Sequence, residues 1–165
     1  MTFILETERL ALREWEPEDA DALFVLTHDP EVMRYVGDGK PWPDIEQTRG
    51  WLARVGESYR TRGWGRWAVV EKESGVAVGS CGFVPLPWSG EIDFGYMFRR
   101  DRWGRGYASE ITPAALLYGF ERYGFPEVVA SIAPENAASR RVLEKLGFVY
   151  RGNEVMQGEE EESEI

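Results

Sequence analysis

The chain has 165 residues, of which 43% are hydrophobic, so it is long enough and apolar enough to fold as one domain around a core. Its formal net charge of -10 argues against direct nucleic-acid binding, because neutralising phosphates requires a broad basic face. The only cysteine, Cys81, excludes an internal disulfide, and there are too few His and Cys residues for a zinc site. No apolar run approaches the roughly 18 residues of a membrane-spanning helix.

The two ends of the chain predict where in the cell the protein is found and which residues are folded. The N-terminal segment lacks the basic start and small-residue cleavage site of a signal peptide, which, with the lack of disulfides, predicts a cytoplasmic protein. Residues 159–164 include five glutamates. We therefore expect residues 1–152 to form the folded domain and residues 153–165 to form a disordered acidic tail. The remaining acidic surface favours cationic partners such as amines.

Hydrophobic periodicity and turn residues predict an alternation of strands and helices along the chain. Strands are expected at 8–15, 66–71, 76–84, 91–98 and 128–132. Helices are expected at 17–28, 44–59, 108–123 and 137–146, with a further helical turn at 31–36. Pro17, Asp44 and Asn136 suit helix beginnings, and Gly124 and Gly147 suit helix ends. This order predicts a single mixed α/β (α+β) domain.

The segment between the expected strand 91–98 and helix 108–123 is the most informative one. Residues 99–110 read RRDRWGRGYASE and gather four arginines and two glycines in an acidic protein. Gly104 and Gly106 let the backbone approach a ligand closely, and the start of the following helix offers unpaired N–H groups. The segment predicts a cradle for a phosphate or pyrophosphate, with an ordinary strand-to-helix turn as the alternative. Its spacing matches neither a P-loop nor a dinucleotide fingerprint.

Three separated signatures occur in a fixed order along the chain. They are TERLALR at 7–13, WGRGYASE at 103–110 and NAASRRVLEKLGF at 136–148. With these signatures the chain resembles the GNAT superfamily of acyl-CoA-dependent N-acetyltransferases, and specifically its RimJ/RimL ribosomal-protein N-terminal acetyltransferase branch. The likeness spans about residues 7–150. It implies a GNAT fold, in which helices flank a mixed central sheet that is splayed at the acyl-CoA site.

The resemblance also implies acetyl-CoA as co-substrate, no metal, and a set of cofactor-binding residues. The family holds the pyrophosphate of coenzyme A on the backbone amides of a Gln/Arg-x-x-Gly-x-Gly/Ala segment, which falls on 103–108 with Trp103 at the first position. It also splays the preceding strand, so that the pantetheine arm can pair with free backbone groups. The cofactor-binding residues implied are Met97, Phe98, Arg102, Trp103, Gly104, Arg105, Gly106, Tyr107, Ala108, Ser109, Asn136 and Ser139.

Acetyl transfer to an amine requires loss of a proton from the nitrogen and gain of a proton by the thiol. Asp93 and Glu91 lie two apart, hence on one face of the expected strand, and are the candidates for the general base. Their alternative role is that of solvated edge carboxylates. Ser139 is the candidate to protonate the departing thiolate, with local hydrogen bonding in the first helical turn as its alternative. At the helix beginning, Glu110 is expected to stabilise the dipole or cap the helix.

The sequence therefore predicts an acetyl-CoA-dependent N-acetyltransferase that transfers an acetyl group directly to a primary amine. The acceptor is a protein N-terminus, an amino acid or another small amine. The alternative is a non-catalytic acyl-CoA-binding or regulatory module of the same fold. We expect no membrane association, and the oligomeric state is left open, with a homodimer as one option. Family members add a strand pair after the Leu-Gly-Phe motif, whereas residues 152–158 here lead into glutamates.

Overall fold

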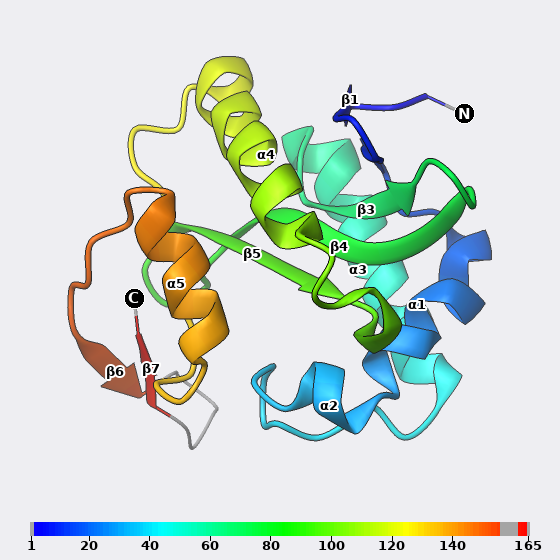
Figure 1. Cartoon of the computed structure of the whole chain (residues 1–165), viewed down its shortest axis with the longest axis horizontal. Coiled ribbons are helices and arrows are strands. Elements are labelled where there is room, and N and C mark those ends of the chain that lie inside the picture. The colour runs from blue at the N-terminus through cyan, green and yellow to red at the C-terminus, as the bar shows by residue number, and fades with distance from the viewer. Residues whose placement is uncertain (1, 156–161, 165) are drawn as a thin grey trace.

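Five antiparallel strands form the central sheet, in the order β1-β2-β3-β4-β5 (Figure 1). The computed structural model of the protein describes residues 2–155 and 162–164. The strands are β1 Leu5–Glu6, β2 Leu10–Arg13, β3 Arg66–Glu71, β4 Val76–Pro85, β5 Ile92–Phe98, β6 Asn153–Val155 and β7 Glu162–Glu164. The helices are α1 Ala20–Thr27, α2 Pro30–Met33, α3 Ile45–Arg62, α4 Tyr107–Tyr123 and α5 Ala137–Lys145, with 3-10 turns at Pro17–Asp19 and Arg100–Arg102.

Local signals in the sequence set most of the helix ends. Asp44 accepts a hydrogen bond from the Gln47 N–H and begins α3, as predicted. This helix runs past the expected end at Tyr59 and stops at Gly63, whose φ of 83° only glycine adopts without strain. Pro17 begins a 3-10 turn rather than the α-helix, which starts at Ala20.

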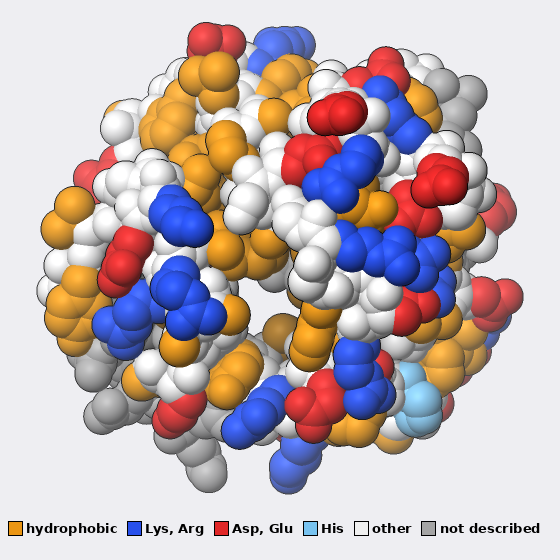
Figure 2. All heavy atoms as spheres, viewed as in Figure 1, with side chains coloured by type: hydrophobic (Ala, Val, Ile, Leu, Met, Phe, Trp, Pro, Cys, Tyr) orange, Lys and Arg blue, Asp and Glu red, His pale blue; other side chains and the backbone are white. Residues whose placement is uncertain are grey.

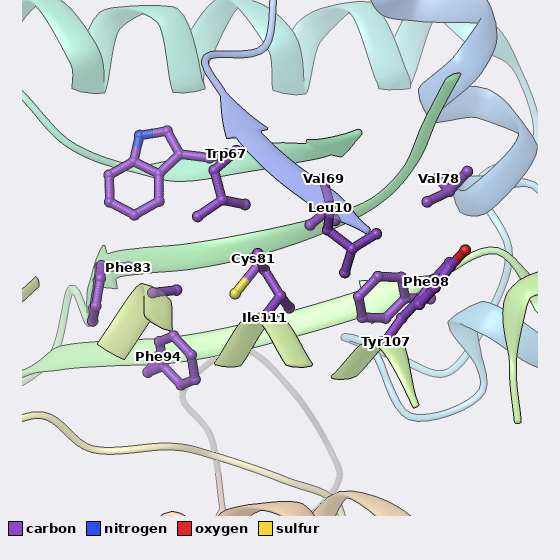
Figure 3. Packing of buried hydrophobic residues seen from close by; sticks show 12 residues of the cluster. Leu10, Trp67, Val69, Val78, Cys81, Phe83, Phe94, Phe98, Tyr107 and Ile111 are labelled. Atoms are coloured by element: carbon purple, nitrogen blue, oxygen red, sulfur yellow. The ribbon is translucent and has the colours of Figure 1, made fainter. Parts of the chain in front are cut away.

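The two faces of the sheet are covered by different helices. One face packs against α4 (Figure 3), and its buried cluster comprises Leu10, Leu12, Trp67, Val69, Val78, Cys81, Phe83, Phe94, Phe98, Tyr107, Ile111 and Ala115. The other face packs against α1 and α3, and its cluster comprises Trp15, Ala20, Leu23, Leu52, Val55, Ala68 and Ala77. Helix α4 lies so close to the sheet that a Cβ on Gly119 would come within 2.3 Å of Phe83 Cζ. Burial of all these side chains supplies the main stabilisation of the fold.

The expected strand 128–132 does not form a continuous strand. Its pairing with β5 is confined, in the described part of the chain, to one parallel bridge between Asp93 and Val129. The mixed sheet predicted from the sequence is therefore an antiparallel sheet with a single parallel contact at its edge. The prediction failed here because a side chain, described below, takes the hydrogen bond of the next position in the ladder.

The C-terminal segment forms a second, two-stranded sheet in which Asn153–Val155 pairs antiparallel with Glu162–Glu164. This differs from the disordered tail expected for 153–165, because backbone hydrogen bonding can pair even strongly charged strands. Residues 156–161 and 165, also part of that expectation, lie outside the described residues. The domain boundary at residue 152 stays a prediction. Among the described residues, no helix has the length and apolar character needed to cross a bilayer.

Candidate functional site

The N-terminus of α4 is built as an open backbone cradle. Gly104 and Gly106 have φ values of 77° and 79°, and Gly106 occupies the N-cap position, where it has no side chain to cap the helix. The first helical hydrogen bond runs from Glu110 N to Gly106 O over 3.0 Å, so the amides of Tyr107, Ala108 and Ser109 precede it. A Cβ on Gly104 would meet no atom within 4 Å, so the space above the loop is open. A diphosphate is the ligand predicted from the sequence for this kind of open helix N-terminus.

Helices α2, α3 and α5 differ from α4 at this point. Each begins with a side chain that accepts a hydrogen bond from its first turn, namely Asp29, Asp44 and Asn136. Among the described α-helices, α1 and α4 lack such a bond, and in α4 the N-cap is a glycine, so its first amides remain open to another acceptor.

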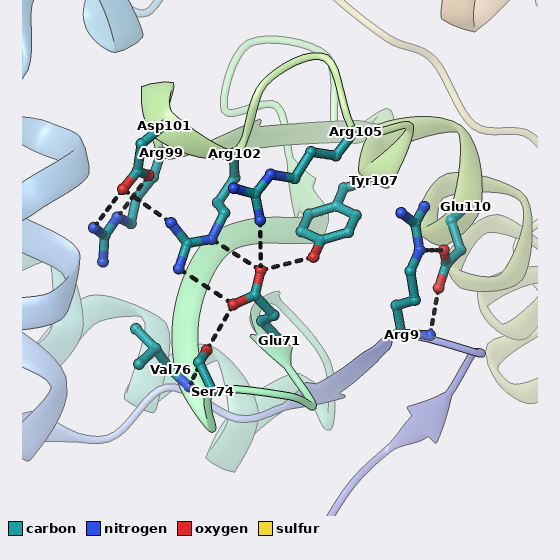
Figure 4. Close-up of polar contacts among 10 residues, drawn as sticks. All are labelled: Arg9, Glu71, Ser74, Val76, Arg99, Asp101, Arg102, Arg105, Tyr107 and Glu110. Carbon is teal, nitrogen blue, oxygen red and sulfur yellow. Dashed lines mark hydrogen bonds and ion pairs between the residues drawn. The ribbon is translucent and has the colours of Figure 1, made fainter.

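A buried carboxylate, Glu71 at the end of β3, holds the loop in place (Figure 4). Arg102 donates to it from Nε over 2.8 Å and from Nη2 over 3.2 Å, and the Tyr107 hydroxyl donates over 2.7 Å. Arg105 lies 3.6 Å away. The hydrogen bonds from Arg102, then that from Tyr107, lower the pKa of Glu71 to about 2, so it is ionised at neutral pH.

This arrangement changes the expected role of Arg102. Its guanidinium is bound to Glu71 and, over 2.9 Å, to Asp101, instead of being free for a phosphate. Arg105 is half-exposed, and its 3.6 Å contact with Glu71 is longer than those of Arg102. Sequence reasoning missed Glu71, although a carboxylate that ends an otherwise apolar strand, RWAVVE, was a signal for it.

Glu110, in the first turn of α4, ties this helix to the N-terminal signature. The Thr7 hydroxyl donates to it over 2.6 Å, and Arg9 donates from its backbone N over 2.9 Å and from Nε over 2.7 Å. Burial raises the pKa of Glu110, and the bonds from Thr7 and Arg9 outweigh this and lower it. The Arg9 guanidinium also lies 4.7 Å from the centre of the Tyr107 ring. Two signatures about a hundred residues apart are thus one structural unit.

The sheet opens immediately after Phe94. Phe94 N donates to Val129 O over 2.7 Å and Val129 N donates to Ile92 O over 2.8 Å, as in a parallel ladder. The next bond of that ladder would run from Ser131 N to Phe94 O. Instead, Ser131 N donates to the Asp93 carboxylate over 3.0 Å. The backbone edge of β5 beyond Phe94 is thereby left facing the opening.

Asp93 is anchored at this position by Arg66. Arg66 Nη2 lies 2.7 Å from Asp93 Oδ2, and the same guanidinium reaches the Gly82 carbonyl. A Cβ on Gly95 would come within 2.9 Å of Arg66 Nη1, so a glycine there leaves room for this side chain. Burial raises the pKa of Asp93 and the charge of Arg66 opposes the rise. Asp93 is only 7% exposed.

The structure separates the two carboxylates that the sequence paired. Glu91 precedes the first residue of β5 and makes a two-pronged ion pair with Arg151, over 2.8 and 3.1 Å. The hydrogen bond from Arg151 lowers the pKa of Glu91. Since the sheet opens only after Phe94, Glu91 lies on the closed side of the Asp93–Val129 bridge.

The remaining predicted residues lie in α5, in the loop before α4 and at the end of β5. Ser139 is in the first turn of α5, where its N–H donates to Asn136 Oδ1 over 3.2 Å. Trp103 is half-exposed and donates its indole N–H to Phe98 O over 2.9 Å. Met97 packs toward α1 and α3. The sequence did not single out Tyr96, whose hydroxyl lies 3.0 Å from Ser139 Oγ.

Positive charge gathers around this opening in spite of the acidic composition. Figure 2 shows a central hollow with Lys and Arg side chains on both sides of it, over α5 and over the loop that precedes α4. A cleft of about 380 Å³ lies beside that loop and is lined by Val25, Asp29, Arg99, Arg100 and Asp101. In the described part of the chain, no group of three or more His, Cys, Asp or Glu side chains is placed to hold a metal ion.

An open helix N-terminus after two glycines and a strand edge exposed beyond Phe94 occur together, and the sequence signatures predict a diphosphate and a linear ligand there. Residues 9–149 match the family described as the acetyltransferase (GNAT) domain. The chain belongs to the GNAT acetyltransferase family. It is an acyltransferase by this membership.

Several known proteins resemble the chain over most of its length. YkkB of Bacillus subtilis, an uncharacterized protein, is 40% identical over 149 residues, covering 88% of this chain and 85% of YkkB. The uncharacterized N-acetyltransferase p20 of Bacillus licheniformis is 34% identical over 149 residues, and the match covers 90% of this chain and 83% of p20. The structure of RimL, a ribosomal L7/L12 alpha-N-protein acetyltransferase in complex with coenzyme A, superposes with a TM-score of 0.79 at 20% sequence identity. The superposition covers 99% of this chain and 95% of RimL.

These comparisons confirm the GNAT fold and the family. The similarity to RimL shows the shared fold alone at that identity, so the RimJ/RimL branch stays a prediction.

Proposed function

We propose that the protein is an acetyl-CoA-dependent N-acetyltransferase of the RimJ/RimL-like branch, which transfers acetyl directly to a primary amine. The observation that carries this proposal is the junction of the open cradle at Gly104–Gly106 with the strand edge exposed after Phe94. A diphosphate on the cradle would direct the rest of coenzyme A along β5, toward Ser139. The signature at 136–148, with Asn136 and Ser139, supports the branch.

In the proposed site, the amides of Tyr107, Ala108 and Ser109 hold the pyrophosphate. The exposed edge of β5 beyond Phe94, near Met97 and Phe98, holds the pantetheine arm, although the Phe98 carbonyl itself is taken by the Trp103 indole, and Asn136 flanks the arm. Arg102 acts by fixing the loop through Glu71, and Arg105 is the arginine that can turn to a phosphate, because its contact with Glu71 is long. No metal is required.

The reaction forms one C–N bond and breaks one C–S bond. The amine nitrogen attacks the thioester carbonyl, loses one proton, and the departing sulfur gains one, so that acetyl-amine and free thiol result. Ser139 is the proposed proton donor to sulfur. Of the two candidate bases we favour Asp93, because it lies where the sheet opens, whereas Glu91 is paired with Arg151 before that point. Each Asp93 oxygen keeps a second lone pair, which can take the proton through a water molecule.

For the acceptor we propose an amine of the three classes considered above: a protein N-terminus, an amino acid or a small amine. The net charge of -10 favours a cationic acceptor. A cytoplasmic location and a homodimer remain part of the proposal.

Thiol release from acetyl-CoA across a panel of amines tests this function. The panel contains peptides with free N-termini, amino acids and polyamines, and Ser139→Ala is assayed beside the wild type. We expect amine-dependent thiol release with at least one class, reduced in the variant. Tight binding of coenzyme A in calorimetry without turnover on any amine would overturn the proposal in favour of a non-catalytic acyl-CoA-binding module.

A further inference from the structure

The hydroxyl of Tyr96 and the hydroxyl of Ser139 lie 3.0 Å apart, one on β5 and the other on α5. Tyr96 is two residues beyond Phe94, where the parallel ladder stops. The contact therefore bridges the two walls of the opening at the level where β5 is exposed. Both residues are partly buried.

We propose that Tyr96 is a positioning residue that aims the Ser139 hydroxyl at the sulfur of coenzyme A and replaces the proton that Ser139 gives up. This inference rests on the proposed function, since it gives Ser139 the role of proton donor.

The first part of the argument is the number of hydrogen bonds that the Ser139 and Tyr96 hydroxyls can make. A serine hydroxyl has one proton to donate and can accept two hydrogen bonds. If Tyr96 is the donor in the pair, the single proton of Ser139 stays available for a third atom. Among the described contacts, Ser139 Oγ has Tyr96 as its partner and does not bond to the backbone of its own helix. The Ser139 backbone N–H takes part in the local bonding of the first turn, with Asn136, while its hydroxyl bonds to Tyr96.

The contact between the two hydroxyls allows either one to be the donor, and the proposal assigns this role to Tyr96. Burial raises the pKa of Tyr96, and the hydrogen bond with Ser139 only partly opposes this rise, so the hydroxyl keeps the proton that it would donate. Tyr107, the other tyrosine of the site, donates its hydroxyl to Glu71 over 2.7 Å and is occupied there. Tyr96 is thus the tyrosine that the fold leaves for Ser139.

The protons lost and gained in the proposed transfer balance without a further reactant. When the C–S bond breaks, the sulfur takes the Ser139 proton, and the Ser139 oxygen takes the Tyr96 proton. The proton that the attacking amine loses then returns to Tyr96 through solvent. A serine hydroxyl alone is a poor acid, so a partner that restores its proton makes it a better donor.

The pKa of the thiol in the complex with coenzyme A tests this inference apart from turnover. It is obtained from the ultraviolet difference between complexes with coenzyme A and with its desulfo analogue, as a function of pH. A hydrogen bond to sulfur stabilises the thiolate, so Ser139→Ala and Tyr96→Phe should each reduce the thiolate at a given pH by roughly tenfold. The double variant should add little to Ser139→Ala, because both act through one bond.

Tyr123→Phe is the matched control, because it removes a tyrosine hydroxyl that bonds to the Gly63 carbonyl at the far end of α4. It should leave the thiol pKa unchanged. If Tyr96→Phe leaves the thiol pKa at the wild-type value while Ser139→Ala raises it, the positioning role is wrong and Tyr96 only packs. If coenzyme A does not bind at all, both this inference and the proposed function fail. If coenzyme A binds and the variants change its thiol pKa as expected, but no acetyl transfer occurs, only the proposed function is contradicted.

Discussion

Asp93 accepts the backbone N–H of Ser131 over 3.0 Å, and by doing so it ends the parallel pairing between β5 and residues 129–132. A side chain thus takes a hydrogen bond that a regular ladder would give to the Phe94 carbonyl. Arg66 holds the carboxylate there, and Gly95 leaves space for Arg66. Contacts within the folded chain itself therefore hold the splay of the sheet.

Removing the Asp93 carboxylate should destabilise the protein and narrow the opening. Asp93→Ala removes the ion-pair partner of the partly buried Arg66 and the acceptor of the Ser131 N–H, so we expect the free energy of unfolding in urea to fall by about 3 kcal/mol. Asp93→Asn should cost less, because its amide oxygen can still accept from Ser131. Both variants should bind coenzyme A more weakly in calorimetry.

Glu46→Gln is the control for this experiment, since Glu46 pairs with Arg49 on the surface with 74% of its side chain exposed. It should change the stability by less than about 1 kcal/mol. Equal stability of Asp93→Ala and Glu46→Gln would show that Asp93 does not hold the splay.

Loss of the Glu71 charge should loosen the cradle. Without the Glu71 charge, the loop before α4 is held less firmly by Arg102 and Tyr107, and binding must order it. We therefore expect Glu71→Gln to weaken coenzyme A binding about tenfold. Glu73→Gln, an exposed carboxylate two residues along, should leave the affinity unchanged. Equal affinities of the two variants would contradict the role of Glu71.

The same residue predicts an acid-dependent stability. Folding lowers the pKa of Glu71 from its ordinary value of 4.5 to about 2, so its contribution to stability is complete above pH 4.5 and is lost as the pH falls toward 2. The difference in unfolding free energy between wild type and Glu71→Gln should therefore shrink over that interval. A difference that stays constant down to pH 2 would assign the stabilisation to packing.

Gly104→Ala separates backbone strain from ligand contact. Gly104 and Gly90 have φ values of 77° and 74°, and a Cβ on either would meet no atom within 4 Å. Each substitution should therefore cost about 1 kcal/mol of stability through the left-handed backbone alone. Only Gly104→Ala should also weaken coenzyme A binding. If both variants bind it as the wild type does, the cradle is not at Gly104.

Glu110→Gln should uncouple α4 from the N-terminal signature. The amide can still accept from Thr7, but the ion pair with Arg9 is lost, so we expect a stability loss of about 1 kcal/mol at neutral pH. Since folding lowers the pKa of Glu110, this loss should diminish as the pH falls below the ordinary carboxyl range. Thermal unfolding at several pH values measures it, with the exposed Glu121→Gln as control. A loss that does not change with pH would exclude the ion pair as its cause.

Local residue chemistry made several elements predictable. The cradle followed from Gly104 and Gly106 because left-handed backbone and free helix amides depend on neighbouring residues only. Asp44 and Asn136 begin their helices for the same reason. The strand 128–132 was predicted from its apolar composition and was wrong as a continuous strand, because whether it pairs depends on Asp93 in another part of the chain.

The sequence by itself determined the family, and it predicted a diphosphate cradle at Gly104 and Gly106, since both rest on short segments whose backbone needs are local. Only the tertiary structure decided which side chains shape and complete the site. The partners Tyr107 and Glu71 are 36 residues apart, Ser131 and Asp93 are 38 apart, and Ser139 and Tyr96 are 43 apart. Such pairs meet because sheet register and helix packing bring them together, and no local pattern in a single sequence records that register.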